Sequence, residues 1–186
     1  MSTNLLQKTI SRAFPGDFAA KAAEFIFLLS VGMVAVILHS KLRMPMHLPG
    51  KQGVLFMMLV VSARGMSRWP FGASISCAGA AMLLLMPGPG FHDPFMAVNY
   101  ILAGCMMDTV FTFMTKQTSK TWLIAGVTGL CWVLVPLIRL TISCFFTMPM
   151  GAFSNGWVYP VITHLAFGLA GGLAAAGILT LAQKNS

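Results

Sequence analysis

Four polar residues interrupt long apolar segments of this 186-residue sequence near one end of each segment. They are Arg139, His164, Asn99 and Tyr100. Polar side chains inside membrane segments cost free energy, so they are candidates for function. At about 1.5 Å of rise per helical residue, their positions predict a shared layer roughly 8–11 Å below one surface. We expect these residues to line a binding cavity in which the Arg139 guanidinium donates two hydrogen bonds to a carboxylate of the ligand.

Each of these residues also has a purely structural interpretation. Arg139 would reach the lipid headgroups or pair with another helix. His164 would be a satisfied core histidine, and Asn99 would hydrogen-bond between helices. The sequence alone leaves both interpretations open.

Two acidic residues lie farther from this layer. Asp108 is deeper in its segment, which favours a structural partner or a gating residue. Glu24 lies near the opposite end, where we expect it at a partner interface or paired with Lys21.

Three loops rich in proline and glycine adjoin the predicted layer: "KLRMPMHLPGKQG", "MPGPGFHDPF" and "TMPMGAFSNG". Proline and glycine fix turns, so these loops could form a lid. The loop or loop-end residues that we expect to contact a ligand are His47, Lys51, His92, Asp93 and Trp157. Lys41, Arg43 and Lys51 would attract anionic ligands.

The repeated "MPM" and the loop histidines also permit a different ligand. Thioether and imidazole groups suit soft metals and haem iron. The chain holds 15 methionines, however, and methionine fills apolar gaps readily. We assign no residue as a metal ligand and expect no cofactor on this chain, while haem, porphyrin or transition-metal uptake stays open as the alternative function.

Several function classes lack their sequence signatures. No G-x-S-x-G or H-E-x-x-H motif and no pair of carboxylates at one depth is present, so we expect no enzyme. The chain has no phosphate-binding loop, so it is not an ATPase. Its four cysteines form no C-x-x-C pair. The basic residues are scattered rather than gathered, which excludes nucleic acid as the expected partner.

The composition explains what must position the polar residues. The chain is 57% hydrophobic and 9% charged, with a mean hydropathy of +0.81. Too few polar residues are present to cover a water-soluble protein. We therefore predict an all-α integral membrane protein, a compact bundle of six transmembrane helices that forms one domain over residues 1–186.

The bundle spans residues 19–182 and follows a cytoplasmic segment, residues 1–18. The six apolar segments are Ala19–His39, Gly50–Met66, Trp69–Met86, Pro94–Thr115, Thr121–Phe146 and Trp157–Ala182. The second and third are short and closely joined, so residues 50–86 form either two short spans or a re-entrant hairpin.

The basic residues predict the orientation of the bundle. Eight Lys and Arg residues lie at the two termini and in the inward turns, against three in the outward loops. Positive residues accumulate on the cytoplasmic side, so both termini are expected inside. The loops with proline and glycine are then outside.

Small residues recur four apart in several segments. Ala19 and Ala23 do so in the first segment, and Gly168 and Gly172 form a GxxxG pair in the last. Such spacing allows close helix contact in lipid. We expect the glycine pair to pack inside the bundle and the alanine pair to face a partner protein or the bundle itself.

The arrangement resembles the substrate-binding S component of an energy-coupling factor (ECF) transporter. The resemblance rests on six short spans, the Ala19/Ala23 pair and the loops "MPMHLPGKQG" and "MPGPGFHDPF" followed by "NYILAGCMMD". Among such components the layout is most similar to the biotin-type members.

The resemblance implies capture of a small, anionic, vitamin-like molecule at a bacterial or archaeal cell membrane. It implies that Ala19 and Ala23 face a transmembrane T component. Two ATP-binding-cassette ATPases would then hydrolyse ATP to power import.

Overall fold

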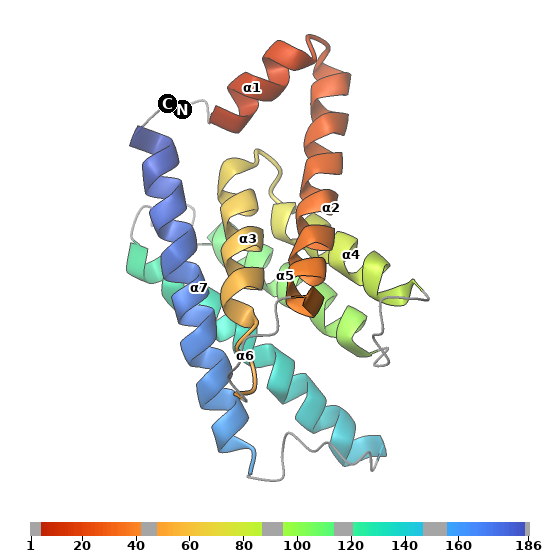
Figure 1. The fold of residues 1–186 in the computed structure, drawn as a ribbon, viewed down its shortest axis with the longest axis vertical. Coiled ribbons are helices and arrows are strands. Elements are labelled where there is room, and N and C mark those ends of the chain that lie inside the picture. Colours follow the sequence, from red (N-terminus) through yellow and green to blue (C-terminus); the bar gives the residue numbers. More distant parts are fainter. Residues whose placement is uncertain (1–4, 42–47, 87–94, 114–120, 147–155, 185–186) are drawn as a thin grey trace.

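The computed structural model describes residues 5–41, 48–86, 95–113, 121–146 and 156–184. Within these ranges the chain forms seven helices and no strand (Figure 1). The helices are α1 (Leu5–Ala13), α2 (Asp17–Lys41), α3 (Gly53–Met66), α4 (Gly72–Leu85), α5 (Phe95–Phe113), α6 (Thr121–Phe146) and α7 (Val158–Lys184). The segment expected before the bundle thus contains a short helix of its own, α1.

The predicted all-α class is confirmed, because each apolar segment contains one helix, α2 to α7. Four of them, α2, α5, α6 and α7, are long and apolar enough to cross a membrane. This finding supports a multi-pass membrane protein. α3 and α4 have 14 residues each. At about 21 Å they are shorter than the ~30 Å hydrocarbon core of a bilayer.

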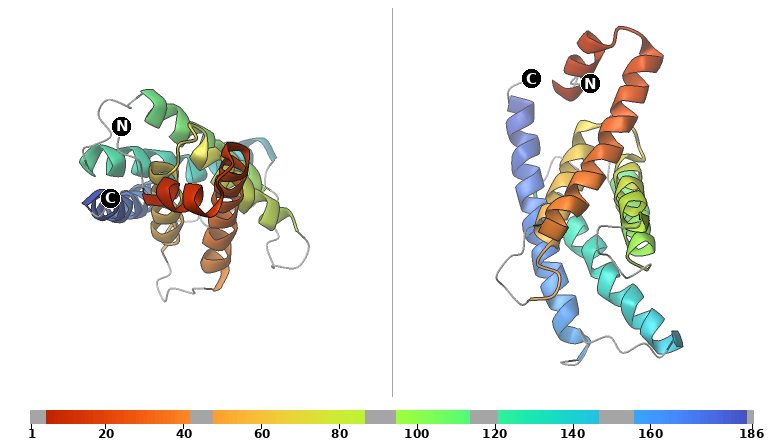
Figure 2. Two further views of the ribbon diagram at one scale, coloured as in Figure 1. Left: turned by 90° about the horizontal axis from the view of Figure 1, so that it is seen from above. Right: turned by 45° about the vertical axis from the view of Figure 1, so that its right-hand side comes forward.

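The six longer helices close into a flattened ring. In contact order the ring runs α2, α3, α7, α6, α5, α4 and back to α2. Seen from above, α2, α3 and α7 form one layer and α4, α5 and α6 the other (Figure 2). The core between them is apolar and contains aromatic residues of three helices, Phe56, Tyr100 and Trp132.

Glycines let the neighbouring helices approach closely. A Cβ atom at Gly172 would lie 2.7 Å from the Cα atom of Ala125, and one at Gly79 would lie 2.8 Å from the Leu29 carbonyl carbon. Gly168 of α7 is likewise buried against α6. The prediction that the GxxxG pair packs inside the bundle is therefore confirmed.

A buried ion pair closes the terminal end of the bundle. Glu24 is fully buried and accepts hydrogen bonds from the Ser67 hydroxyl and from the backbone and Nε of Arg68, at 2.7–2.8 Å. Lys21 instead pairs with exposed Asp17, at 2.8 Å. We expected Glu24 to lie at a partner interface or to pair with Lys21. Both expectations are wrong, because Glu24 lies on the inward face of α2.

Asp108 holds a second junction at this end. Its carboxylate accepts from Arg64 Nε at 2.7 Å and from the backbone N–H groups of Ala73 and Ser74 at 3.1 and 2.6 Å. These N–H groups begin α4, so the carboxylate from α5 caps another helix where the helix dipole favours negative charge. The structural role expected for Asp108 is confirmed.

Candidate ligand-binding pocket

The bundle contains a pocket of about 240 Å³ in the half of the molecule away from both termini. Its walls come from the carboxyl-terminal end of α2, the turn before α3, the middle and carboxyl-terminal part of α6, and the starts of α5 and α7. The lining residues are His39, Pro49, Gly50, Gln52, Met96, Asn99, Tyr100, Trp132, Val135, Pro136, Arg139, Pro160 and His164. The volume suits a small molecule.

The four residues predicted to share a layer meet in this pocket. Arg139 reaches it from α6, His164 from α7, and Asn99 and Tyr100 from α5. Three consecutive helices therefore place these side chains around one space. This convergence is the geometry that the sequence predicted.

The predicted loop contacts have different outcomes. Lys51 is half-buried and lies between Gly50 and Gln52, which line the pocket, but it is not a lining residue itself. Trp157 is 56% exposed and does not line the pocket. The remaining loop candidates lie outside the described residues; they are His47, His92 and Asp93.

Asn99 is the pocket residue whose hydrogen bonding points most directly to a ligand. Its side chain is 1% exposed, and within the described part of the chain neither its amide nitrogen nor its amide oxygen has a hydrogen-bond partner. Leaving buried polar atoms unsatisfied costs about 1–3 kcal/mol. A ligand that offers both an acceptor and a donor would remove this cost.

Aromatic rings form one wall of the pocket. Tyr100 and Trp132 are stacked, with ring centroids 6.1 Å apart and planes at 13°. Phe56 supports both rings from inside the core, at 4.5 and 5.6 Å. The wall is apolar and flat, so it would orient a ligand while the polar residues hold its charged or polar groups.

The two pocket histidines are held by hydrogen bonds. His164 Nδ1 lies 2.7 Å from the Pro160 carbonyl oxygen, which can only accept. Nδ1 therefore carries the hydrogen, and Nε2 of the neutral ring is left as an acceptor. His39 Nδ1 lies 3.3 Å from the Tyr100 hydroxyl.

The turn before α3 is joined to the pocket residues by hydrogen bonds. Trp132 Nε1 donates to the Gly50 carbonyl at 3.3 Å, and Gln52 Nε2 donates to the His39 carbonyl at 3.1 Å. Gly50 has φ +79°, and a Cβ atom there would lie 2.7 Å from His164 Nδ1. Only glycine combines this backbone with so close an approach. Pro49, Gly50 and Gln52 thus form part of the pocket wall.

His39, Gln52 and Trp132 are pocket residues that the sequence did not identify. His39 ends an apolar segment and Trp132 is an apolar residue within one, so neither contrasts with its surroundings in the sequence. Pro136 gave a usable signal, because a proline inside α6 removes one helical hydrogen bond beside the pocket.

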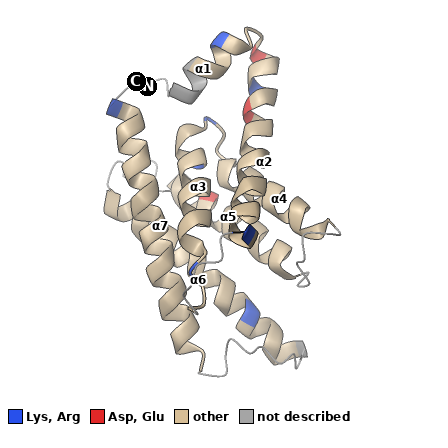
Figure 3. Cartoon of the chain, viewed as in Figure 1, with Lys and Arg blue, Asp and Glu red and all other residues tan. Residues whose placement is uncertain are grey.

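Charge is distributed unequally along the molecule. Among the described lining residues none is acidic and Arg139 is cationic, and Lys51 lies in the adjoining turn. The three described acidic residues lie in α2 and α5 toward the terminal end (Figure 3). The pocket therefore favours an anion.

The metal alternative gains no support from the described residues, which contain no group of three or more His, Cys, Asp or Glu that could hold an ion. The "MPM" methionines and the loop histidines that motivated it lie outside them.

The alanine pair lies at the other end of α2. Ala19 is exposed and Ala23 is half-buried, whereas the adjacent Ala20 and Glu24 face the bundle interior. Ala19 thus presents a small side chain at the exposed start of α2, on a helix whose other exposed residues include Phe18 and Ile26. This placement leaves room for another helix.

Comparison of the chain with protein-family models, with curated proteins and with solved structures gave no match. The functional interpretation therefore depends on the pocket itself.

Proposed function

We propose that this chain is the substrate-binding S component of an ECF-type uptake transporter and captures a small, anionic, vitamin-like molecule. The observation that carries the proposal is the unsatisfied amide of Asn99, buried in a pocket that Arg139 also lines. A cationic group and an unused donor–acceptor pair, set against an aromatic wall, suit a small acid with polar groups.

The proposal extends to orientation and partners. The pocket end faces outward and both termini lie in the cytoplasm, because the basic residues concentrate toward the termini. A transmembrane T component and two ATP-binding-cassette ATPases power import across a bacterial or archaeal cell membrane. The chain contributes no phosphate-binding loop, which is consistent with this division of labour.

Asn99→Leu tests the role of the unsatisfied amide. The change keeps the side-chain shape but removes both orphaned polar atoms, so ligand-free protein should gain about 1–2 kcal/mol of stability. That gain corresponds to a rise in Tm of about 4 °C. Affinity for the co-purifying ligand should fall at the same time. Thermal unfolding in detergent and isothermal titration measure the two effects.

Ser76→Ala is the matched control. The Ser76 hydroxyl is also buried without a partner in the described residues, but it lies in α4 and does not line the pocket. This variant should keep the wild-type affinity. An Asn99→Leu protein that binds as tightly as Ser76→Ala would contradict the proposed ligand contact.

Ala19→Leu tests the proposed partner face. The larger side chain should block close approach of a T component while leaving the distant pocket unchanged. We expect normal ligand binding by the purified chain and loss of uptake in cells that also produce the T component and ATPases. Ala170→Leu, at an exposed small residue of α7, is the control. Equal uptake by both variants would exclude Ala19 from the coupling surface.

A further inference from the structure

The amino-terminal end of the chain carries a surface that neither the pocket nor the proposed partner pair uses. α1 (Leu5–Ala13) precedes α2 in this segment and carries Arg12 in its last turn. Phe14 follows α1, Pro15 and Gly16 turn the chain, and Phe18 lies in the first turn of α2. Phe18 is 86% exposed, and Phe14 is also exposed.

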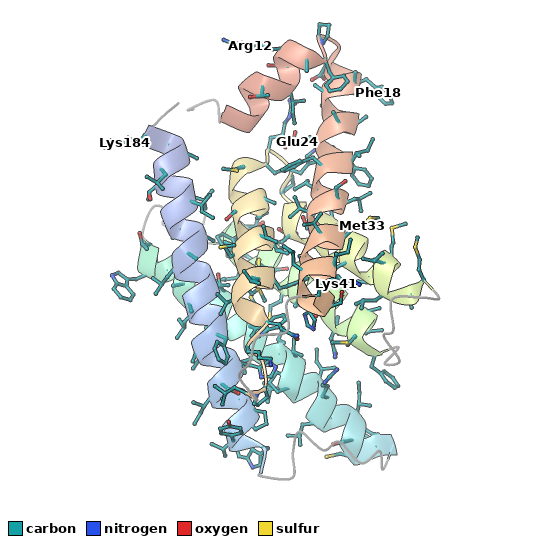
Figure 4. All side chains as sticks on the ribbon, viewed as in Figure 1. Arg12, Phe18, Glu24, Met33, Lys41 and Lys184 are labelled. Carbon is teal, nitrogen blue, oxygen red and sulfur yellow. The ribbon has the colours of Figure 1, made fainter. Side chains whose placement is uncertain are left out.

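Basic side chains accompany these two aromatic rings. Arg12 is exposed and has no ion-pair partner among the described residues, and Lys21 is exposed while paired with Asp17. Arg12 and Phe18 both point away from the bundle (Figure 4). Residues 1–21 hold three basic residues and one acidic residue, so the segment is cationic as a whole.

The length of α2 sets the depth of this surface. The helix has 25 residues, or about 37 Å, which exceeds the ~30 Å hydrocarbon core of a bilayer. Its first turn therefore reaches the headgroup layer when the rest of the helix crosses the membrane. α1 runs across the end of the bundle at this level (Figure 1).

We infer that Arg12, Phe14, Phe18 and Lys21 form an amino-terminal anchor that binds the headgroup layer of anionic phospholipids on the side of the termini. Aromatic rings favour the boundary between headgroups and acyl chains, and Lys and Arg bind anionic headgroups. The two Phe rings enter that boundary while Arg12 contacts the headgroups. The anchor fixes the tilt of α2, the helix that also bears His39 of the pocket and Ala19.

A Phe18→Trp variant makes the anchor visible by fluorescence. The full-length chain is reconstituted in vesicles of brominated phosphatidylcholine, with or without brominated phosphatidylglycerol. The parent spectrum is subtracted to remove the four native tryptophans. Bromine should quench the added emission, and more strongly when phosphatidylglycerol is present.

Removing the Arg12 charge should weaken this response. In the phosphatidylglycerol vesicles, Arg12→Gln in the Phe18→Trp background should lower the ratio of inserted to withdrawn anchor about fivefold, since one basic residue near an anionic surface contributes ~1 kcal/mol. Lys184→Gln removes the same charge from α7 and should leave the quenching unchanged.

Two results would overturn the inference. Absence of quenching in both lipids would show that the segment faces water or protein. Equal quenching in both lipids, unaffected by Arg12→Gln, would show apolar insertion without recognition of anionic headgroups.

Discussion

Arg139→Gln is expected to abolish tight binding of the ligand while the protein stays folded. Arg139 is the one cationic residue among the described residues that line the pocket, so it is the group expected to bind the anionic group of the ligand. Removing one partner of a buried, hydrogen-bonded charge pair costs about 2–5 kcal/mol. The Kd should therefore rise about 30- to 5,000-fold. Isothermal titration with the molecule identified after co-purification measures this change.

Two further variants test whether the loss of affinity in Arg139→Gln depends on the guanidinium group and on its position in the pocket. Arg139→Lys keeps the charge but loses the planar fork, so its Kd should lie between those of wild type and Arg139→Gln. Arg12→Gln removes a charge at the opposite end of the molecule and should leave the Kd unchanged. A wild-type Kd for Arg139→Gln would exclude a direct contact between Arg139 and the ligand's anionic group.

The largest expected loss of stability follows from Asp108→Asn. The substitution leaves the Arg64 guanidinium, which is mostly buried, without its ion pair, and it presents an amide where the α4 N–H groups need an acceptor. Breaking a buried ion pair in this way costs about 3–5 kcal/mol. Thermal unfolding should show a Tm lowered by about 10 °C.

The exposed ion pair between Asp17 and Lys21 provides the control for the Asp108→Asn variant. Asp17→Asn removes the same charge from a carboxylate whose pair with Lys21 is exposed and screened by water, so its Tm should stay close to that of the wild type. Adding Arg64→Gln to Asp108→Asn should restore part of the loss, because no unpaired buried cation then remains. Equal Tm values for Asp17→Asn and Asp108→Asn would contradict the assigned role of the Asp108 junction.

The sequence predicted those pocket residues that are polar, because a polar side chain inside a membrane segment costs free energy and is therefore conspicuous. Arg139, Asn99 and His164 stand out because each is polar within an apolar segment, and helical rise then gives their depth. Apolar and boundary residues give no such contrast. His39 and Trp132 could therefore be placed only by the structure, which brings the end of α2 and the middle of α6 to one pocket.

Pairing between charged residues was harder to predict than their depth. Lys21 lies close to both Asp17 and Glu24 in sequence, and only the rotation of α2 decides which carboxylate faces inward. The partner of Glu24 is Arg68, whose position depends on the turn between α3 and α4. The helix α1 was missed for a different reason, because it has only nine residues and lies outside the apolar segments from which the other helices were predicted.

Mass spectrometry of the small molecules released from the purified chain tests the proposed function most directly. We predict that wild-type protein releases one small acid, enriched over control membranes. The same compound should be absent from Arg139→Gln and depleted from Asn99→Leu. Release of no enriched acid by wild-type protein, or equal release by wild type and Arg139→Gln, would contradict a binding function for this pocket.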